Sequence, residues 1–284
     1  MGAWSIGTDS SLLNMTFSCL DGPQLGQNLA YTRFLFVRPP QLDDAIRQRL
    51  RGVGDQLARR FFNVFDLESG GTDSPPHEMI QFLSINGFGT DASASSIQPV
   101  ATHVMQVTSK YGPSLDDAEK ELRRRVEGLA TVATLPGVVR VPQYTSVEMY
   151  AWAYAQAKGR SSGRVTPNAI ILPIRKTDAW WRMPPMERHR FFYPHHDPES
   201  GTCVPGHAEL GRAAAGRIFR RVFYNPAGEN RRGEWDFITY FECADDDLGH
   251  FDETLAAMRD TSRNPEWRFV EEGPIWRGRR QLRW

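Results

Sequence analysis

A strand–helix–strand pattern occurs twice in this chain, once in each half, and few folds accommodate it. In the first copy, a strand at 102–109 is followed by a helix from Ser114 and a second strand at 137–142. In the second copy, a strand at 235–243 is followed by a helix from Asp246 and a second strand at 267–272. Both helices carry acidic residues in their first turn, where the helix dipole favours negative charge. A sequence that repeats this unit predicts two ferredoxin-like α+β domains.

Further hydrophobic patterns complete each copy. Residues 42–61 have apolar side chains at helical spacing, whereas 32–37, 77–85 and 168–176 are short β-like runs. Residues 178–192 contain a tryptophan pair followed by a predicted helix with prolines in its first turn.

Polar segments divide the chain. Residues 1–28 are polar and rich in Gly and Ser, so we expect an N-terminal arm there. The stretch 158–168 has the composition of a connector between the halves. We therefore expect one ferredoxin-like domain at 29–160 and a second at 161–284.

The composition excludes several classes of protein. The 34 basic and 34 acidic residues cancel, so nothing favours nucleic acid or an anionic membrane surface as a partner. No apolar run is long enough to span a membrane, and the N-terminus lacks the pattern of a signal peptide. Cys19, Cys203 and Cys243 show no metal-binding spacing, which predicts reduced thiols in a cytoplasmic protein.

Arg220 is the charge that most needs an explanation. In a predicted strand, Ile218, Arg220 and Val222 share one face, so the arginine points toward an apolar layer. A buried charge is costly unless a partner answers it. Arg220 could pair across the sheet with Asp236 or Glu242, or it could face a bound cofactor.

From residue 168 onward, the order of motifs resembles the chlorite dismutase family of haem proteins. The first motifs are the strand NAIILPIRK, then AWWRM and a helix containing ER. The segment from His207 follows, with GR and AGRI after the histidine. The strand DFITYFE, an amphipathic helix and a final strand complete the order. The first half matches the family only in architecture and length. The resemblance implies an α+β fold in which two fused ferredoxin-like domains form a dimeric α+β barrel within one chain. It also implies one non-covalent haem b in the second half.

The resemblance assigns roles to five side chains. It makes His207 the iron ligand and Arg220 the arginine on the opposite side of the haem. Trp180 and Trp181 would line the haem, and Tyr144 would lie near a propionate.

An apparent insertion at 195–206 leaves a second candidate for the iron ligand. Counted forward from Trp181 without a gap, His195 takes the ligand position, whereas counting back from Arg220 selects His207. We prefer His207 because GR and AGR follow it, as in the family. The His195–His196 pair with Asp197 and Cys203 could instead form a metal cluster.

A haem-binding imidazole needs an acceptor for its other ring nitrogen, because that hydrogen bond fixes the tautomer. The candidates in the sequence are Glu209, Glu234 and Glu242.

The resemblance implies an oxidoreductase that uses an iron-oxo intermediate to act on a small oxidant, such as a peroxide or chlorite. Glu272 stands where members that act on chlorite tend to carry tryptophan, which disfavours chlorite. Leu172 stands where the coproheme decarboxylase branch has a reactive tyrosine, which disfavours that activity. The alternatives are a non-catalytic haem-binding or sensing protein and a haem-free barrel enzyme. A homo-oligomer is expected, as a dimer, pentamer or hexamer.

Overall fold

The structure is a computed structural model that describes residues 28–60, 62–63, 78–89, 101–109, 111–140, 166–228, 234–281 and 284. Most of the expected N-terminal arm, the expected domain boundary at 160 and Tyr144 lie outside these residues. The first half below means residues 28–140, and the second half means residues 166–284.

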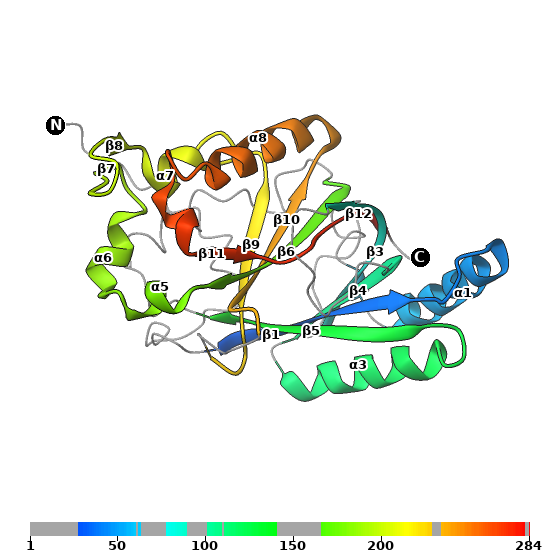
Figure 1. Cartoon of the computed structure of the whole chain (residues 1–284). Helices are drawn as coiled ribbons and strands as arrows, with labels where there is room; N and C mark the ends of the chain where they lie inside the picture. Colours follow the sequence, from blue (N-terminus) through cyan, green and yellow to red (C-terminus); the bar gives the residue numbers. More distant parts are fainter. Residues whose placement is uncertain are drawn as a thin grey trace.

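Each half contributes strands and its own helices (Figure 1). The first half contains β1 (Asn28–Arg38), α1 (Asp44–Arg60), β2 (Phe62–Asn63), β3 (Glu78–Gly89), β4 (His103–Ser109), α3 (Gly112–Arg125) and β5 (Thr131–Arg140). The second half contains β6 (Asn168–Lys176), α5 (Asp178–Arg182), α6 (Pro185–Arg190), β7 (His195–His196), β8 (Cys203–Val204), α7 (Gly206–Leu210), β9 (Phe219–Tyr224), β10 (Phe237–Cys243), the 3-10 helix η1 (Asp245–Asp247), α8 (Leu248–Arg259), the 3-10 helix η2 (Pro265–Phe269), β11 (Val270–Glu272) and β12 (Ile275–Gln281).

Eight of the strands close into one antiparallel barrel. Their order is β10-β9-β5-β1-β4-β3-β12-β6, and β6 pairs back with β10. Within each half, the barrel strands follow the ferredoxin-like order fourth-first-third-second. The halves join where β5 pairs with β9 and where β3 pairs with β12. The expected α+β barrel of two fused ferredoxin-like units is therefore confirmed.

Alternating side chains give the sheet two apolar faces. Phe34 and Phe36 of β1 point into the barrel and pack with Tyr240 and Trp276 from the second half. Leu35 lies between them in sequence and points outward into the first-half core. The outer face of each half therefore needs helices to cover it.

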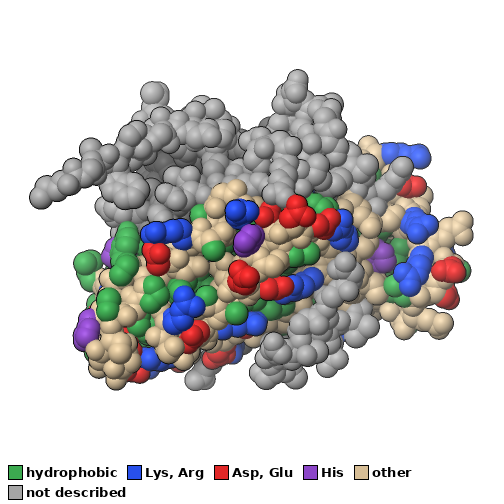
Figure 2. Space-filling view, turned by 90° about the horizontal axis from the view of Figure 1, so that it is seen from above, with side chains coloured by type: hydrophobic (Ala, Val, Ile, Leu, Met, Phe, Trp, Pro, Cys, Tyr) green, Lys and Arg blue, Asp and Glu red, His purple; other side chains and the backbone are tan. Residues whose placement is uncertain are grey.

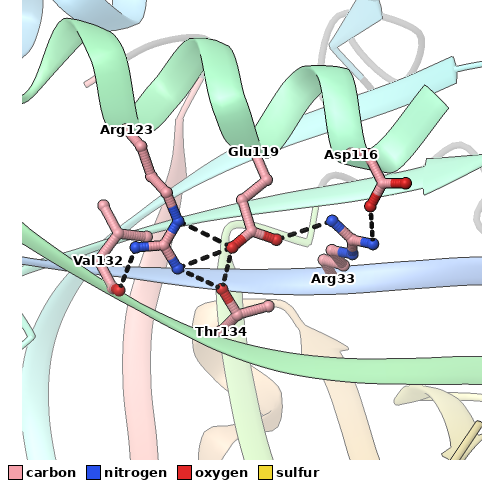
Figure 3. Close-up of polar contacts among 6 residues, drawn as sticks. All are labelled: Arg33, Asp116, Glu119, Arg123, Val132 and Thr134. Carbon is pink, nitrogen blue, oxygen red and sulfur yellow. Dashed lines mark hydrogen bonds and ion pairs between the residues drawn. The ribbon is translucent and has the colours of Figure 1, made fainter. Parts of the chain in front are cut away.

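Two long helices fill the outer face of the first half. Their buried side chains include Leu50 and Leu57 of α1 and Leu115 and Leu122 of α3. Ion pairs then fix α3 to the strands, because Glu119 accepts hydrogen bonds from Arg33, Arg123 and Thr134, and Asp116 also pairs with Arg33 (Figure 3). The outer face of this half is packed with side chains.

Shorter helices surround the outer face of the second half. The helix expected within 178–192 forms as two, α5 and α6, because Pro184 and Pro185 interrupt it. Helices α7 and η2 span five residues each, and α8 spans twelve. Short helices cover a sheet incompletely, so space remains between them and the strands.

The strand expected at 267–272 forms only over its second half, as β11, and it does not close the barrel. Pro265 starts the 3-10 helix η2, which extends to Phe269, and only the short β11 is extended. The strand that closes the barrel is β12, where Trp276, Gly278 and Arg280 are buried in alternation. Its arginines hide this alternation in the sequence.

Among the described residues, none of the helices combines the length and the apolar character needed to cross a membrane. Figure 2 shows Lys and Arg side chains interspersed with Asp and Glu over the described part of the face seen from above. That part of the surface therefore carries charge of both signs.

Candidate functional site

A cavity of about 200 Å³ lies between the outer face of the second-half sheet and the helices that cover it. Its floor consists of alternate strand residues: Leu172, Ile174 and Lys176 of β6, Arg220 and Val222 of β9, and Phe237, Thr239 and Phe241 of β10. Its other walls include Trp180, Arg188, His207, Gly211, Ala214, Ala215, Ile218, Phe251, Leu255 and Glu266. The prediction that Ile218, Arg220 and Val222 share one face is confirmed.

His207 lies at the start of α7 and lines the cavity. Gly206 makes the turn possible, because its φ is +75° and a Cβ there would lie 2.3 Å from the carbonyl oxygen of Tyr193. A backbone hydrogen bond of 3.0 Å from His207 N to Phe191 O then holds the start of the helix. The local backbone thus sets the position of the imidazole.

Glu266 orients the His207 ring. Its Oε2 lies 3.1 Å from His207 Nδ1, and its Oε1 accepts a 2.7 Å hydrogen bond from Lys176 Nζ. Burial by itself raises the pKa of Glu266, but the charge of Lys176 and the hydrogen bond from His207 outweigh it and hold that pKa well below its usual value. Because Glu266 is ionised, it accepts a hydrogen bond from the Nδ1–H group of His207. The other ring nitrogen, Nε2, then keeps a free electron pair.

The three acceptors expected from the sequence are wrong. Glu209 pairs with Arg212, Glu234 accepts a hydrogen bond from Asn225, and Glu242 pairs with Arg280. The acceptor is Glu266, which is part of an Asn-Pro-Glu segment without a periodic pattern and lies 59 residues from His207 in sequence.

Arg220 reaches the cavity from β9 and makes no hydrogen bond or ion pair with any other described residue. The expected alternative, an ion pair across the sheet, is wrong. Asp236 accepts a 2.7 Å hydrogen bond from the backbone N of Lys176, and Glu242 pairs with Arg280 at 3.0 Å. A guanidinium that has no partner among the described residues and lies on a mostly apolar floor is suited to bind an anion.

The tryptophan pair divides between two positions. Trp180 is 2% exposed and lines the cavity, with Lys176 Nζ 4.2 Å from the centre of its ring. Trp181 does not line the cavity: its Nε1 donates to Asp236 at 3.2 Å, and its ring stacks on Phe237. The structure therefore brings only the first of the two tryptophans to the predicted site.

Two buried donors in the cavity wall lack a partner within the part of the chain that the structure describes. They are Trp180 Nε1 and Arg188 Nε. The Arg188 guanidinium also lies 5.7 Å from the centre of the Trp181 ring. A buried donor without a partner costs free energy, so these groups favour a ligand that accepts hydrogen bonds. Arg188 was not predicted, because its short helix carries basic residues at three consecutive positions.

His195 lies outside the cavity lining. The insertion at 195–206 begins with the hairpin β7–β8, where His195 Nδ1 is 2.9 Å from the carbonyl oxygen of Tyr193. Asp197, expected as part of a metal cluster, accepts a hydrogen bond from Arg268 at 3.3 Å. No group of three or more His, Cys, Asp and Glu side chains that could hold a metal ion occurs among the described residues.

The residues around the cavity fit a haem. An imidazole whose Nδ1 is hydrogen-bonded to a carboxylate could offer Nε2 to a haem iron. Gly211, Ala214 and Ala215 contribute small side chains to the lining, which would leave room for a flat group beside a mostly apolar floor. The unpaired donors of Trp180 and Arg188 suit carboxylates at its edge.

Three structures of chlorite dismutase from Candidatus Nitrospira defluvii are similar to this chain. An arginine variant has a TM-score of 0.59 at 16% identity, a tryptophan variant in complex with cyanide 0.59 at 15%, and the complex with imidazole 0.58 at 16%. Each match covers 90% of this chain and 92% of the other. No protein-family model matches the sequence. The chain thus has the fold of the chlorite dismutases.

Proposed function

We propose that the chain is a chlorite dismutase-like haem b oxidoreductase that acts on a small oxidant, with its cofactor in a second domain at 161–284. One observation carries this proposal: His207 and Arg220 line the same cavity. A buried carboxylate orients the first, and the second has no partner among the described residues.

His207 Nε2 would bind the iron. Glu266 fixes the tautomer through Nδ1, and Lys176 keeps Glu266 ionised, so the imidazole is held as an electron-rich donor. When bound, the haem supplies the redox chemistry that cleaves an O–O or Cl–O bond.

Arg220 would bind the oxidant or stabilise its departing oxyanion. Its charge is permanent, and a fixed donor aimed at developing negative charge lowers the barrier without reorganising. Apolar neighbours in the floor, such as Val222 and Phe241, exclude water and strengthen this electrostatic effect.

Arg188 and Trp180 would hold the carboxylates of the haem. Both carry a buried donor that a propionate oxygen would satisfy. Trp181 lies outside the lining, and we assign it the indirect role of supporting Arg188 through ring contact. Tyr144 near a propionate stays a prediction.

The substrate would be a small anion or a peroxide, because a haem leaves little of the cavity free. Leu172 is 2% exposed in the floor and has no proton to relay, so the activity does not use a reactive side chain there. Glu272 accepts hydrogen bonds from Trp267 and Arg259 and lies outside the lining. Because it stands where family members that act on chlorite tend to carry tryptophan, it favours a peroxide over chlorite. The homo-oligomer and the cytoplasmic location stay predictions.

An absorption titration with haem tests the proposal. The wild-type chain should take up one haem and show a Soret band, because the described cavity offers His207 Nε2 to the iron. His207→Ala should lose that band, whereas the matched control His195→Ala should keep it. A His207→Ala variant that binds haem with an unchanged spectrum would rule out His207 as the ligand.

A further inference from the structure

Two links join the same two segments beside the cavity. The first is the hydrogen bond between His207 Nδ1 and Glu266. The second is made by Arg268, which donates to Asp197 Oδ2 at 3.3 Å and to Glu199 Oε2 at 2.6 Å. His207 lies just after the hairpin β7–β8, and Arg268 lies two residues after Glu266 in η2. The two links therefore run in parallel.

The hairpin end of the second link is well ordered by its own hydrogen bonds. Asp197 is 2% exposed, and its backbone N donates to Thr202 O at 2.9 Å. Its carbonyl accepts from Gly201 N at 2.9 Å, and its carboxylate accepts from Ser200 N at 3.1 Å. Arg268 thus binds a buried carboxylate in a closed turn.

The η2 end is anchored to the cavity wall. Thr177 N, at the start of α5, donates to Phe269 O at 3.0 Å. The Phe269 ring packs 6.3 Å from Trp180 and 5.8 Å from Phe191, measured between ring centres. Because Glu266 lies in η2, a displacement of η2 would move Glu266 relative to His207.

We infer that Arg268 is a positioning residue: it clips the hairpin β7–β8 to η2 and so holds Glu266 against the His207 ring. The role of His207 as an iron ligand rests on the proposed function. His207 and Glu266 are 59 residues apart in sequence, so their hydrogen bond depends on the docking of two separate segments. Hydrogen bonds weaken steeply with misalignment, and a second contact between the same segments restricts that misalignment.

The experiment compares Arg268→Ala with the matched control Arg33→Ala. Each arginine binds two carboxylates on another element, and their side chains are 29% and 23% exposed. Arg33 lies on β1 in the first half and does not line the cavity; Figure 3 shows its two ion pairs. We expect both variants to lose stability, but only Arg268→Ala should change the His207 environment.

The readouts are the iron–histidine stretching frequency of the ferrous haem complex and the rate of haem loss. Arg268→Ala should lower the frequency and speed haem loss about tenfold, the lower end of the effect known for partners of metal-bound histidines. Arg268→Lys, which keeps the charge, should restore part of both. Glu199→Gln removes the more exposed carboxylate, 68% exposed, and should give a smaller shift in the same direction even if Arg268→Ala does not fold.

Nitrogen NMR of His207 in the haem-free chain separates this inference from the proposed function. The wild-type chain and Arg33→Ala should show one tautomer with the proton on Nδ1, and Arg268→Ala should show a mixture. The positioning role of Arg268 would be overturned if Arg268→Ala matched Arg33→Ala in its His207 signals, its iron–histidine frequency and its rate of haem loss. A wild-type chain that binds no haem, but whose His207 signals respond to Arg268→Ala, would overturn the proposed function and support the clip.

Discussion

Arg220 and Lys176 both place a positive charge on the apolar face of a strand, but only one of the two charges is compensated by an acidic side chain among the described residues. Lys176 is neutralised by Glu266, whereas Arg220 has no partner among the described residues. Strand alternation predicted the position of Arg220, and the same reasoning on 168–176 would have found Lys176. Glu266 could not be predicted, because it lies in a 3-10 turn and meets its partners only through tertiary folding.

At the residue scale, Arg220→Ala should keep haem but lower the rate of peroxide turnover by roughly 10²–10³, because one preorganised charge is lost. The turnover rate of Arg220→Lys should lie between those of the wild-type chain and Arg220→Ala, because lysine keeps the charge but lacks the planar guanidinium. Arg217→Ala is the control, because Arg217 pairs with Asp247 outside the cavity lining. Stopped-flow absorption would measure the rates.

Unchanged turnover in Arg220→Ala would remove this arginine from the mechanism. A wild-type chain that binds haem but turns over no oxidant would support the alternative of a non-catalytic haem-binding protein.

Arg188→Ala should weaken haem binding about tenfold, because a charge-assisted hydrogen bond to a propionate is lost. Haem dimethyl ester has no carboxylate charge, so it should bind the wild-type chain and the variant equally. Arg190→Ala, an exposed change on the same helix, is the control. Equal weakening of haem and ester by Arg188→Ala would show that Arg188 acts through packing alone.

At the scale of elements, continuous apolar runs predicted strands, whereas charges and prolines concealed other elements. The run 168–176 forms as predicted, as β6. In β12 the arginines conceal the alternation, and in 178–192 the two prolines divide a helix. The hairpin within 195–206 has no strong signal, because its strands β7 and β8 span only two residues each.

The turn that starts α7 can be tested with two glycines that share a left-handed backbone. Gly201 has a φ of +68° and open space around its Cβ position, so Gly201→Ala should lower the free energy of unfolding by about 1 kcal/mol. Gly206→Ala adds a clash with the Tyr193 carbonyl and should lower it by about 3 kcal/mol. Only Gly206→Ala should also weaken haem binding, because it displaces His207. Equal losses of stability in denaturant titrations would contradict this account of the turn.

At the scale of the whole molecule, two copies of one topology differ in how their outer faces are covered, and the cavity described above lies in the second. The repeated pattern predicted the duplication, and the family resemblance assigned the cofactor to the second half. The reason for the asymmetry could not be read from the sequence. Helices α1 and α3 fill the outer face of the first half, whereas short helices leave space in the second.

The stability of the molecule should fall between neutral pH and about pH 4. Burial, followed by the charge of Arg47, lowers the pKa of His103 to about 4. The unfolded chain therefore binds more protons below about pH 6.5, so stability present above that pH is lost as pH falls. The loss from this group should be about 2 kcal/mol at about pH 5. Urea unfolding of His103→Gln should lack this loss, and an equal loss in both chains would contradict the assignment.

The central claim is that this cavity holds an iron porphyrin on His207. The most direct measurement is a crystal structure of the haem-loaded chain, with anomalous diffraction recorded at the iron edge. The account predicts one iron peak per chain within coordination distance of His207 Nε2, with Arg220 on the opposite side of the ring. A peak beside His195, or a cavity without iron in a chain that has taken up haem, would contradict it.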